Sequence, residues 1–258
     1  PTGVELAGAM AEIAAESIPR DFRFINTASA RILLLEGADR VLPTYPPDLS
    51  ESARRQLARL GVETRTGALV TDIDEHGVHV AGEVIAAGNI FWAAGVAASP
   101  LGAAVGGPLD DAGRVRVGDD CAVPGRPEIF VIGDLAHIQQ DGRALPGVAQ
   151  VAIQSGRHAA RMIRADLAGK ERSPFHYTDK GSLATIGRNA AVADFGRLRF
   201  GGFLAWLLWA FVHILYLIGF RNRILVMIQW AWAWLSYQRG IRLITGHPDV
   251  PIARSRGS

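Results

Sequence analysis

The chain has 258 residues, of which 49% are hydrophobic and 20% charged, with a formal net charge of +2. This length allows one large or two ordinary domains, and the small net charge gives no indication of nucleic-acid binding. The single cysteine, Cys121, excludes an internal disulfide, a Cys-x-x-Cys redox pair and a cysteine-ligated iron–sulfur cluster.

The first hundred residues alternate helix and strand patterns. They predict a helix over 3–16 ended by Pro19, a strand over 31–36, a helix over 51–60 with Ser50 as its N-cap, strands within 61–65 and 69–85, and a strand over 89–92. This alternation is typical of an α/β nucleotide-binding domain. Because the chain starts with Pro-Thr-Gly rather than Met, we expect an N-terminal part to be missing.

Residues 1–8, Pro-Thr-Gly-Val-Glu-Leu-Ala-Gly, resemble the end of a Gly-x-Gly-x-x-Gly loop that enters its helix. Gly3 would be the last glycine of the loop, and the helix N-terminus would face a pyrophosphate. Glu36 ends the next predicted strand, where a carboxylate can bind the adenosine ribose hydroxyls and oppose a 2′-phosphate, which favours NADH over NADPH. The plainer alternatives are a helix with packing glycines and a solvated acid at a strand end.

The second half contains the run Ile-Phe-Val-Ile-Gly-Asp at 129–134, followed by a predicted helix over 148–167. A strand predicted over 128–132 would end in Gly133 and Asp134. Glycine lets the backbone approach a ligand, and the aspartate can accept hydrogen bonds from sugar-type hydroxyls. The pattern therefore predicts a flavin site.

Three further groups of residues have a functional and a plainer interpretation. Trp-Ala-Ala-Gly-Val at 92–96 would let a flat ring lie against Ala94 and Gly95, or is a tight turn. Gln150 and Gln154 share one helix face and could orient a carbonyl-bearing ligand, or are exposed amides. Lys180 could stabilise negative charge on a reduced flavin, or pairs with Asp179.

The last part of the chain is apolar and rich in tryptophan and arginine. Residues 203–220 contain only His213 as a strongly polar side chain, Arg221 and Arg223 interrupt, and 224–237 resume with tryptophans. A bilayer span needs about 20 apolar residues, so we expect two helices that lie in one leaflet rather than two full spans. A buried helix pair in a soluble protein is the alternative.

Together these segments resemble the type II NADH:quinone oxidoreductases, over essentially the whole chain from Pro1 to about Thr245. The specific parts are 1–8, Trp-Ala-Ala-Gly-Val at 92–96, Phe-Val-Ile-Gly-Asp at 130–134, Ala-Gln-Val-Ala-Ile-Gln at 149–154, Asp-Lys-Gly-Ser-Leu-Ala at 179–184 and the aromatic tail.

The resemblance implies an α/β fold with two Rossmann-like nucleotide-binding domains, both incomplete here, plus a C-terminal helical membrane-anchoring region. Residues 1–97 would bind NADH, 98–182 would be the returning part of the FAD domain, and 183–258 would be the anchor. It further implies a homodimer at the cytoplasmic face of the cell membrane that reduces quinone without pumping protons.

The same resemblance implies roles for individual residues. Glu5 would lie near the nicotinamide–flavin junction, and Ala149 would line the cofactor. Gln150 and Gln154 would orient the quinone, with Lys180 beside the reduced flavin. The alternatives are an enzyme like the sulfide:quinone oxidoreductases, for which one cysteine is too few, and a membrane-associated binding module without catalysis.

Overall fold

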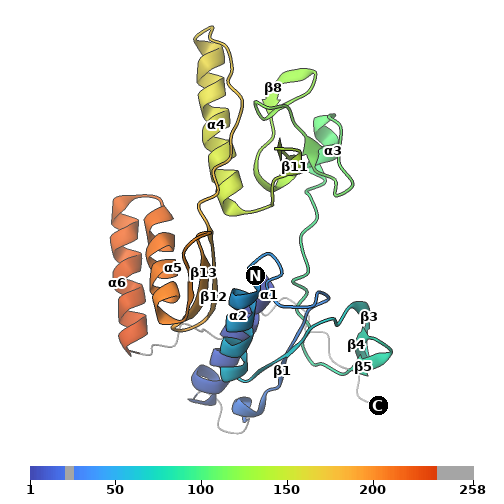
Figure 1. The fold of residues 1–258 in the computed structure, drawn as a ribbon, viewed down its shortest axis with the longest axis vertical. Coiled ribbons are helices and arrows are strands. Elements are labelled where there is room, and N and C mark those ends of the chain that lie inside the picture. The colour runs from blue at the N-terminus through green and yellow to red at the C-terminus, as the bar shows by residue number, and fades with distance from the viewer. Residues whose placement is uncertain (21–25, 237–258) are drawn as a thin grey trace, which may run out of the picture. The chain divides into compact units, whose positions relative to one another are not determined.

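The computed structural model describes residues 1–20 and 26–236, which form two compact units (Figure 1). The first unit comprises residues 1–90 together with the chain from Ser182 onward, and the second comprises Phe91–Gly181. The strands from Ser182 onward belong to the same compact unit as the N-terminal helix.

The chain opens with a helix, which is followed by a βαβ unit. Helix α1 spans Thr2–Glu12 and continues through a π-helical turn, Ile13–Ser17, and a 3₁₀ turn, Ile18–Arg20. After a 3₁₀ turn at Thr27–Ser29, strand β1 (Ile32–Leu35) pairs in parallel with β2 (Val62–Arg65), with Ile32 opposite Val62. Helix α2 (Pro47–Arg59) provides the crossover that parallel strands require. The predicted helix and both strands are confirmed, but α2 begins earlier than expected.

The prediction that Ser50 caps this helix is wrong. Helix α2 starts at Pro47 because proline is preorganised for the first helical position, where its missing N–H loses no bond. Ser50 lies one turn inside the helix, where it is buried and donates its hydroxyl to the carbonyl oxygen of Leu42 at 3.2 Å.

Two antiparallel sheets complete the first unit. The first contains β3 (Val70–Asp74), β4 (Gly77–Val80) and β5 (Glu83–Ile85), which confirms the predicted alternating strands and their turn. The second contains β12 (Ser182–Gly187), β13 (Ala190–Asp194) and β14 (Arg199–Gly201).

The β12–β14 sheet separates two helical layers. On one face Ala184, Ile186 and Val192 join the main core with residues of α1 and α2. On the other face Ala191 and Ala193 pack against Ala205 of α5. Successive residues of a strand point to opposite faces of the sheet. The alanines of β12 and β13 therefore allow helices to pack closely on both faces.

Helices α5 (Phe203–Tyr216) and α6 (Phe220–Ser236) form an antiparallel pair (Figure 1). Stacked rings join them, with Trp206 on Trp234 and Trp209 on Trp230. The break between the helices lies at Leu217–Gly219 rather than at Arg221 and Arg223, which belong to the first turn of α6. None of the described helices has both the length and the apolar character that crossing a bilayer requires.

The second unit has short strands and one long helix. Its helices are α3 (Leu101–Val105), a 3₁₀ turn (Gly133–Leu135) and α4 (Ala149–Leu167). Its strands are β6 (Val115–Arg116), β7 (Ala122–Val123), β8 (Arg126–Phe130), β9 (Ala136–His137), β10 (Gln139–Gln140) and β11 (Arg143–Ala144). Strand β6 pairs in parallel with β9, and β7 pairs with β8 in antiparallel orientation.

Two strand predictions in this region need correction. Residues 89–92 form no strand: Phe91 and Trp92 are 58% and 63% exposed, and no strand pairs with them. The strand predicted over 128–132 spans Arg126–Phe130, so it ends before the Gly-Asp turn. At 89–92 an apolar run has no partner strand, and near 128–132 the paired strand begins and ends two residues earlier than expected, because periodicity identifies neither the partner nor the exact ends of a strand.

Candidate functional site: a cavity beside Asp134

The Gly-Asp turn is held against the start of α4. Gly133 has a φ of +62°, and its N–H donates to the hydroxyl of Ser155 at 3.4 Å. A Cβ at this position would lie 3.2 Å from the Cβ of Ala152, so a side chain would meet both backbone strain and a tight contact. This turn exposes the following residue, Asp134.

A cavity of about 250 Å³ lies beside the Asp134 carboxylate. It is lined by Asp134 with Val96, Ala97, Ala98, Ala112, Arg114 and Gly147. The Asp134 carboxylate accepts no hydrogen bond from any described residue, and an added Cβ at Gly147 would lie 3.4 Å from its Oδ1. The cavity therefore has one acidic wall kept open by a glycine.

These residues fit the sugar-alcohol part of a flavin nucleotide. A carboxylate without a partner is a strong acceptor for hydroxyl groups, and the walls at 96–98 are small and apolar. The volume suffices for part of such a cofactor and not for the whole. Ala94 and Gly95 directly precede this wall and are exposed. The backbone of Gly95 has a positive φ of +106°.

The first turns of α4 carry the two predicted glutamines, and the structure distinguishes them. Gln154 binds the backbone of Thr178 twice: its amide donates to the carbonyl at 2.9 Å and accepts from the N–H at 3.1 Å. Gln150, one turn earlier and after the exposed Ala149, has a buried Oε1 without a partner. Gln154 thus fixes the segment that carries the exposed Lys180, whereas the buried Oε1 of Gln150 has no hydrogen-bond partner among the described residues.

The predicted NADH residues lie in the first unit. Gly3 is in the first turn of α1. Glu5 accepts the backbone N–H of Thr185 on β12 at 3.2 Å, so its carboxylate also closes the edge of that strand. The Glu36 carboxylate accepts the N–H of Ala38 at 3.0 Å, directly after β1. That turn holds the acid at the carboxyl end of a parallel strand, where nucleotide ligands bind in α/β sheets.

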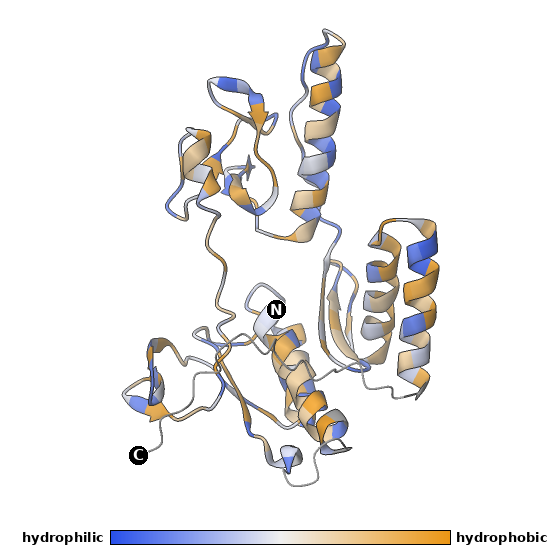
Figure 2. Ribbon diagram, turned by 180° about the vertical axis from the view of Figure 1, so that it is seen from behind, coloured by the Kyte–Doolittle hydropathy of each residue, from blue (hydrophilic) through white to orange (hydrophobic). Residues whose placement is uncertain are grey.

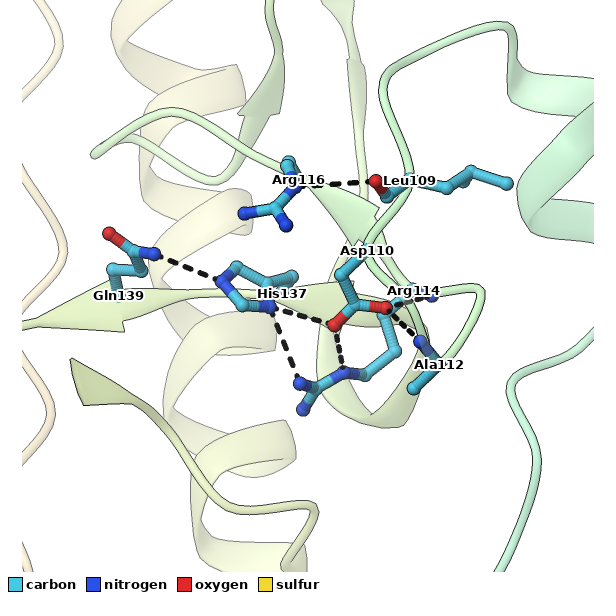
Figure 3. A network of polar contacts seen from close by, with 7 residues as sticks. All are labelled: Leu109, Asp110, Ala112, Arg114, Arg116, His137 and Gln139. Atoms are coloured by element: carbon cyan, nitrogen blue, oxygen red, sulfur yellow. Dashed lines mark hydrogen bonds and ion pairs between the residues drawn. The ribbon is translucent and has the colours of Figure 1, made fainter.

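Sequence reasoning missed a polar network in the second unit (Figure 3). Asp110 accepts four hydrogen bonds: from the backbone N–H groups of Ala112 and Arg114, from Nε of Arg114 at 2.7 Å and from Nδ1 of His137 at 2.8 Å. Burial raises the pKa of the Asp110 carboxyl, but these bonds outweigh it and hold the pKa far below its usual range. The spacing of Asp110 and Arg114 was visible in the sequence; the contact with His137 was not.

Two family models match the chain. Residues 1–156 match the pyridine nucleotide-disulphide oxidoreductases, and residues 180–237 match the NDH2 C-terminal domain. The parallel βαβ unit, the Gly-Asp turn and the first match together place the chain in the α/β pyridine nucleotide-disulphide oxidoreductase family.

Curated relatives narrow the assignment. The chain is 44% identical over 99% of its length to the type II NADH:quinone oxidoreductase Ndh of Mycobacterium tuberculosis, and 42% identical to NdhA of the same organism. It therefore belongs to the type II NADH:quinone oxidoreductase family. It covers 57% and 54% of those two relatives, so it spans about half the length of the proteins it matches.

A solved structure supports the fold. The NDH2 structure from Plasmodium falciparum in complex with NADH matches with a TM-score of 0.80 and 19% identity, over 90% of this chain and 64% of that one. At that identity the match concerns the fold alone.

Proposed function

We propose that the protein passes two electrons from NADH through FAD to a membrane quinone, without pumping protons. The observation that carries this proposal is the open Asp134 carboxylate at the cavity wall, in a chain whose relatives are named as NADH:quinone oxidoreductases. Bound FAD supplies the two-electron chemistry, and the chain supplies position and charge.

The roles of the residues follow from their chemistry. Asp134 binds the ribityl hydroxyls, and Gly133, Ala94, Gly95 and Ala149 allow close approach of the cofactor. Gly3 and the N-terminus of α1 bind the NADH pyrophosphate, and Glu36 binds the adenosine ribose. Glu5 borders the nicotinamide.

On the acceptor side, Gln150 orients the quinone, and Lys180 stabilises negative charge on the reduced centre. Gln154 acts through the Thr178 backbone that it binds, as a positioning residue. This distinguishes the two glutamines, which the sequence alone treated as equivalent.

We further propose that α5 and α6 bind the cytoplasmic surface of the cell membrane, in a homodimer. Many of their apolar side chains are exposed, and Figure 2 shows apolar stretches along both helices. Examples are Phe211 at 61%, Phe220 at 79% and Ile228 at 58%. Large apolar side chains exposed on neighbouring helices are typical of a membrane or protein interface.

The charges of α6 favour an anionic surface. Arg221 and Arg223 lie in its first turn, where the helix dipole opposes positive charge, so helix stability does not explain them. Basic residues beside an apolar surface are attracted to anionic headgroups. Helix α5 has 14 residues and a length of about 21 Å, shorter than the bilayer core, which is consistent with a helix lying in one leaflet.

The buried thiol disfavours the sulfide-oxidising alternative. Cys121 is fully buried, and this burial raises its pKa to about 12, so its reactive thiolate form is suppressed. The sequence contains no second cysteine with which Cys121 could form a redox pair.

A spectroscopic experiment tests the proposed function. The purified protein, supplied with FAD, is expected to show flavin absorption that bleaches with NADH and returns on addition of a quinone analogue. Sulfide in place of NADH is expected to have no effect. A protein that takes up no flavin, or whose bound flavin ignores NADH, would overturn the proposal.

A further inference from the structure

A second glutamine binds the same segment as Gln154. Residues 171–181 belong to no helix or strand. Gln140, the last residue of β10, pairs with the backbone of Tyr177: its amide nitrogen donates to the carbonyl oxygen at 3.2 Å, and its Oε1 accepts from the N–H at 2.8 Å. Gln154 of α4 makes the same two contacts with Thr178. Side chains from two different elements therefore bind consecutive residues of this segment.

Each amide acts as a neighbouring strand would. In an extended chain, the N–H and C=O of one residue point to the same side, and those of the next residue point to the opposite side. Gln140 and Gln154 therefore hold the segment from its two sides, and we call this arrangement the amide clamp. The orientation of each amide is defined by its partners, since an N–H requires the oxygen and a carbonyl requires the nitrogen.

The amide clamp lies directly before Lys180. The N–H of Gly181 donates to Oδ1 of Asp179 at 2.9 Å, and Gly181 has a φ of +88°. This contact is a turn closed by an aspartate side chain, and Lys180 is its central residue. The backbone of Lys180 is therefore held by the clamp on one side and by the turn around it.

We propose that Gln140 is a positioning residue for the acceptor side of the reaction. With Gln154 it fixes the backbone from which the Lys180 side chain extends. A lysine side chain is long and flexible, so the place where its ammonium group acts depends on where its backbone is held. Gln140 acts through the backbone of Tyr177 rather than on the reacting atoms. This inference rests on the proposed function, because Lys180 has its role there.

Selective labelling of lysine tests the clamp without a cofactor. Lys170 and Lys180 are the only lysines in the sequence, so ¹⁵N-lysine gives two backbone amide signals in an NMR spectrum. The Lys170 N–H donates to the carbonyl oxygen of Ala165 at 2.9 Å, just after α4, and serves as the internal reference. Gln140→Leu removes both contacts with Tyr177. We expect it to lower the ¹H–¹⁵N NOE of Lys180 and to leave that of Lys170 unchanged.

The two half-reactions test the role in turnover. With FAD bound, Gln140→Leu is expected to slow reoxidation of the reduced flavin by a quinone analogue about 3- to 10-fold, as for two lost neutral hydrogen bonds. Reduction by NADH is expected to stay within about twofold. The matched control is Gln139→Leu: Gln139 precedes Gln140 in β10, and its amide nitrogen lies 3.1 Å from Nε2 of His137 instead (Figure 3).

Gln140→Glu gives a milder test if Gln140→Leu does not fold. Its ionised side chain keeps an acceptor for the Tyr177 N–H but has no donor for the carbonyl oxygen, so the Lys180 NOE is expected to fall at about pH 7. A protonated carboxyl group supplies both an acceptor and a donor. The NOE is therefore expected to recover as the pH falls toward about 4.

The outcomes separate the two proposals. The positioning role is wrong if the Lys180 NOE is unchanged in folded variants of Gln140, if quinone reoxidation keeps its wild-type rate, or if both half-reactions slow equally. In each of these cases the proposed function stands. If the wild-type flavin is not reduced by NADH or not reoxidised by the quinone, the proposed function fails, and the role of Gln140 in it fails too, whatever the NOE.

Discussion

Asp134 and Glu36 are the two carboxylates for which the sequence predicted a role in binding hydroxyl groups, and the structure adds their surroundings. Their residue types and positions after apolar runs predicted hydroxyl recognition. The turn that holds Glu36 is local, since its donor is the N–H of Ala38, whereas the wall beside Asp134 is formed by Gly147, 13 residues further along the chain.

Glu36→Gln is expected to reduce discrimination against NADPH. A neutral amide can still accept from the ribose but no longer repels a 2′-phosphate, so the ratio of the NADPH to the NADH dissociation constant should fall about tenfold. Nucleotide titration with fluorescence detection measures the ratio. Glu75→Gln, an exposed acid on the β3–β4 turn, serves as the control, and an unchanged ratio in Glu36→Gln would remove the ribose assignment.

Glu12 is a partly buried carboxylate that gives a pH prediction. Burial raises the pKa of its carboxyl above the usual 4.5, more than the hydrogen bond from the Arg188 backbone N–H lowers it. Because the folded pKa lies above the unfolded value, the associated stability is present below the unfolded pKa and is lost as pH rises through the folded one.

Glu12→Gln keeps an oxygen acceptor for Arg188 and removes the charge. We therefore expect the variant to be more stable than the wild type at pH 7, with the difference vanishing toward pH 4. Urea unfolding between pH 4 and 8 measures this, with the exposed Glu171→Gln as control. A variant that is less stable at pH 7, with a gap that widens as pH rises, would contradict the burial argument.

At the scale of elements, α1 and β12 approach so closely that one glycine is required. A Cβ at Gly8 would lie 1.5 Å from the carbonyl oxygen of Ile186, which is backbone and cannot move alone. Glu5 and Glu12 lie on the same helix and accept backbone N–H groups of the β12–β13 hairpin, at Thr185 and Arg188. The helix therefore closes an otherwise open strand edge.

Gly8→Ala is expected to destabilise the protein by about 3 kcal/mol or more, because the helix must move away from the sheet. The gain of about 1 kcal/mol in helix propensity does not offset this. Gly88→Ala is the matched control: its Cβ would meet nothing within 4 Å, so a change within about 0.5 kcal/mol is expected. Equal effects in urea denaturation would show that the close approach is not rigid.

At the scale of the whole molecule, the C-terminal helices combine attachment on one side with apolar exposure on the other. Ala205 packs on β13, the Trp234 indole donates to the side chain of Asn189 at 2.8 Å, and the Arg188 guanidinium lies over the Trp234 ring. Phe211 and Ile228 remain 61% and 58% exposed. The helix pair is therefore attached to the sheet and still exposes apolar side chains to a membrane or a protein partner.

Phe211→Asp with Ile228→Asp is expected to weaken binding to phosphatidylglycerol vesicles at least tenfold, because each side chain loses its transfer energy. Sedimentation with vesicles measures the binding, and raised salt should weaken it in the wild type through screening. Leu69→Asp, which replaces a 69% exposed leucine outside the helix pair, is the control. A changed oligomeric state with unchanged vesicle binding would assign this surface to the dimer instead.

Local pattern determined much of this protein. Helix α1, the βα crossover, α4, the paired strands near the C-terminus and both apolar helices follow from periodicity and turn residues, and the Gly-Asp motif indicated the class of ligand. These features depend on neighbours within a few turns, so a single sequence specifies them.

Tertiary structure decided which groups meet. It brought Asp110 to His137, 27 positions away, and bound Gln154 to Thr178 while the Oε1 of Gln150 has no partner among the described residues. It also left residues 89–92 without a partner strand and placed the strands from Ser182 onward in the same unit as α1. Hydrogen bonds and close packing between distant segments depend on the course of the whole backbone. That course is determined by the burial of apolar side chains from every element together, which no local sequence pattern specifies.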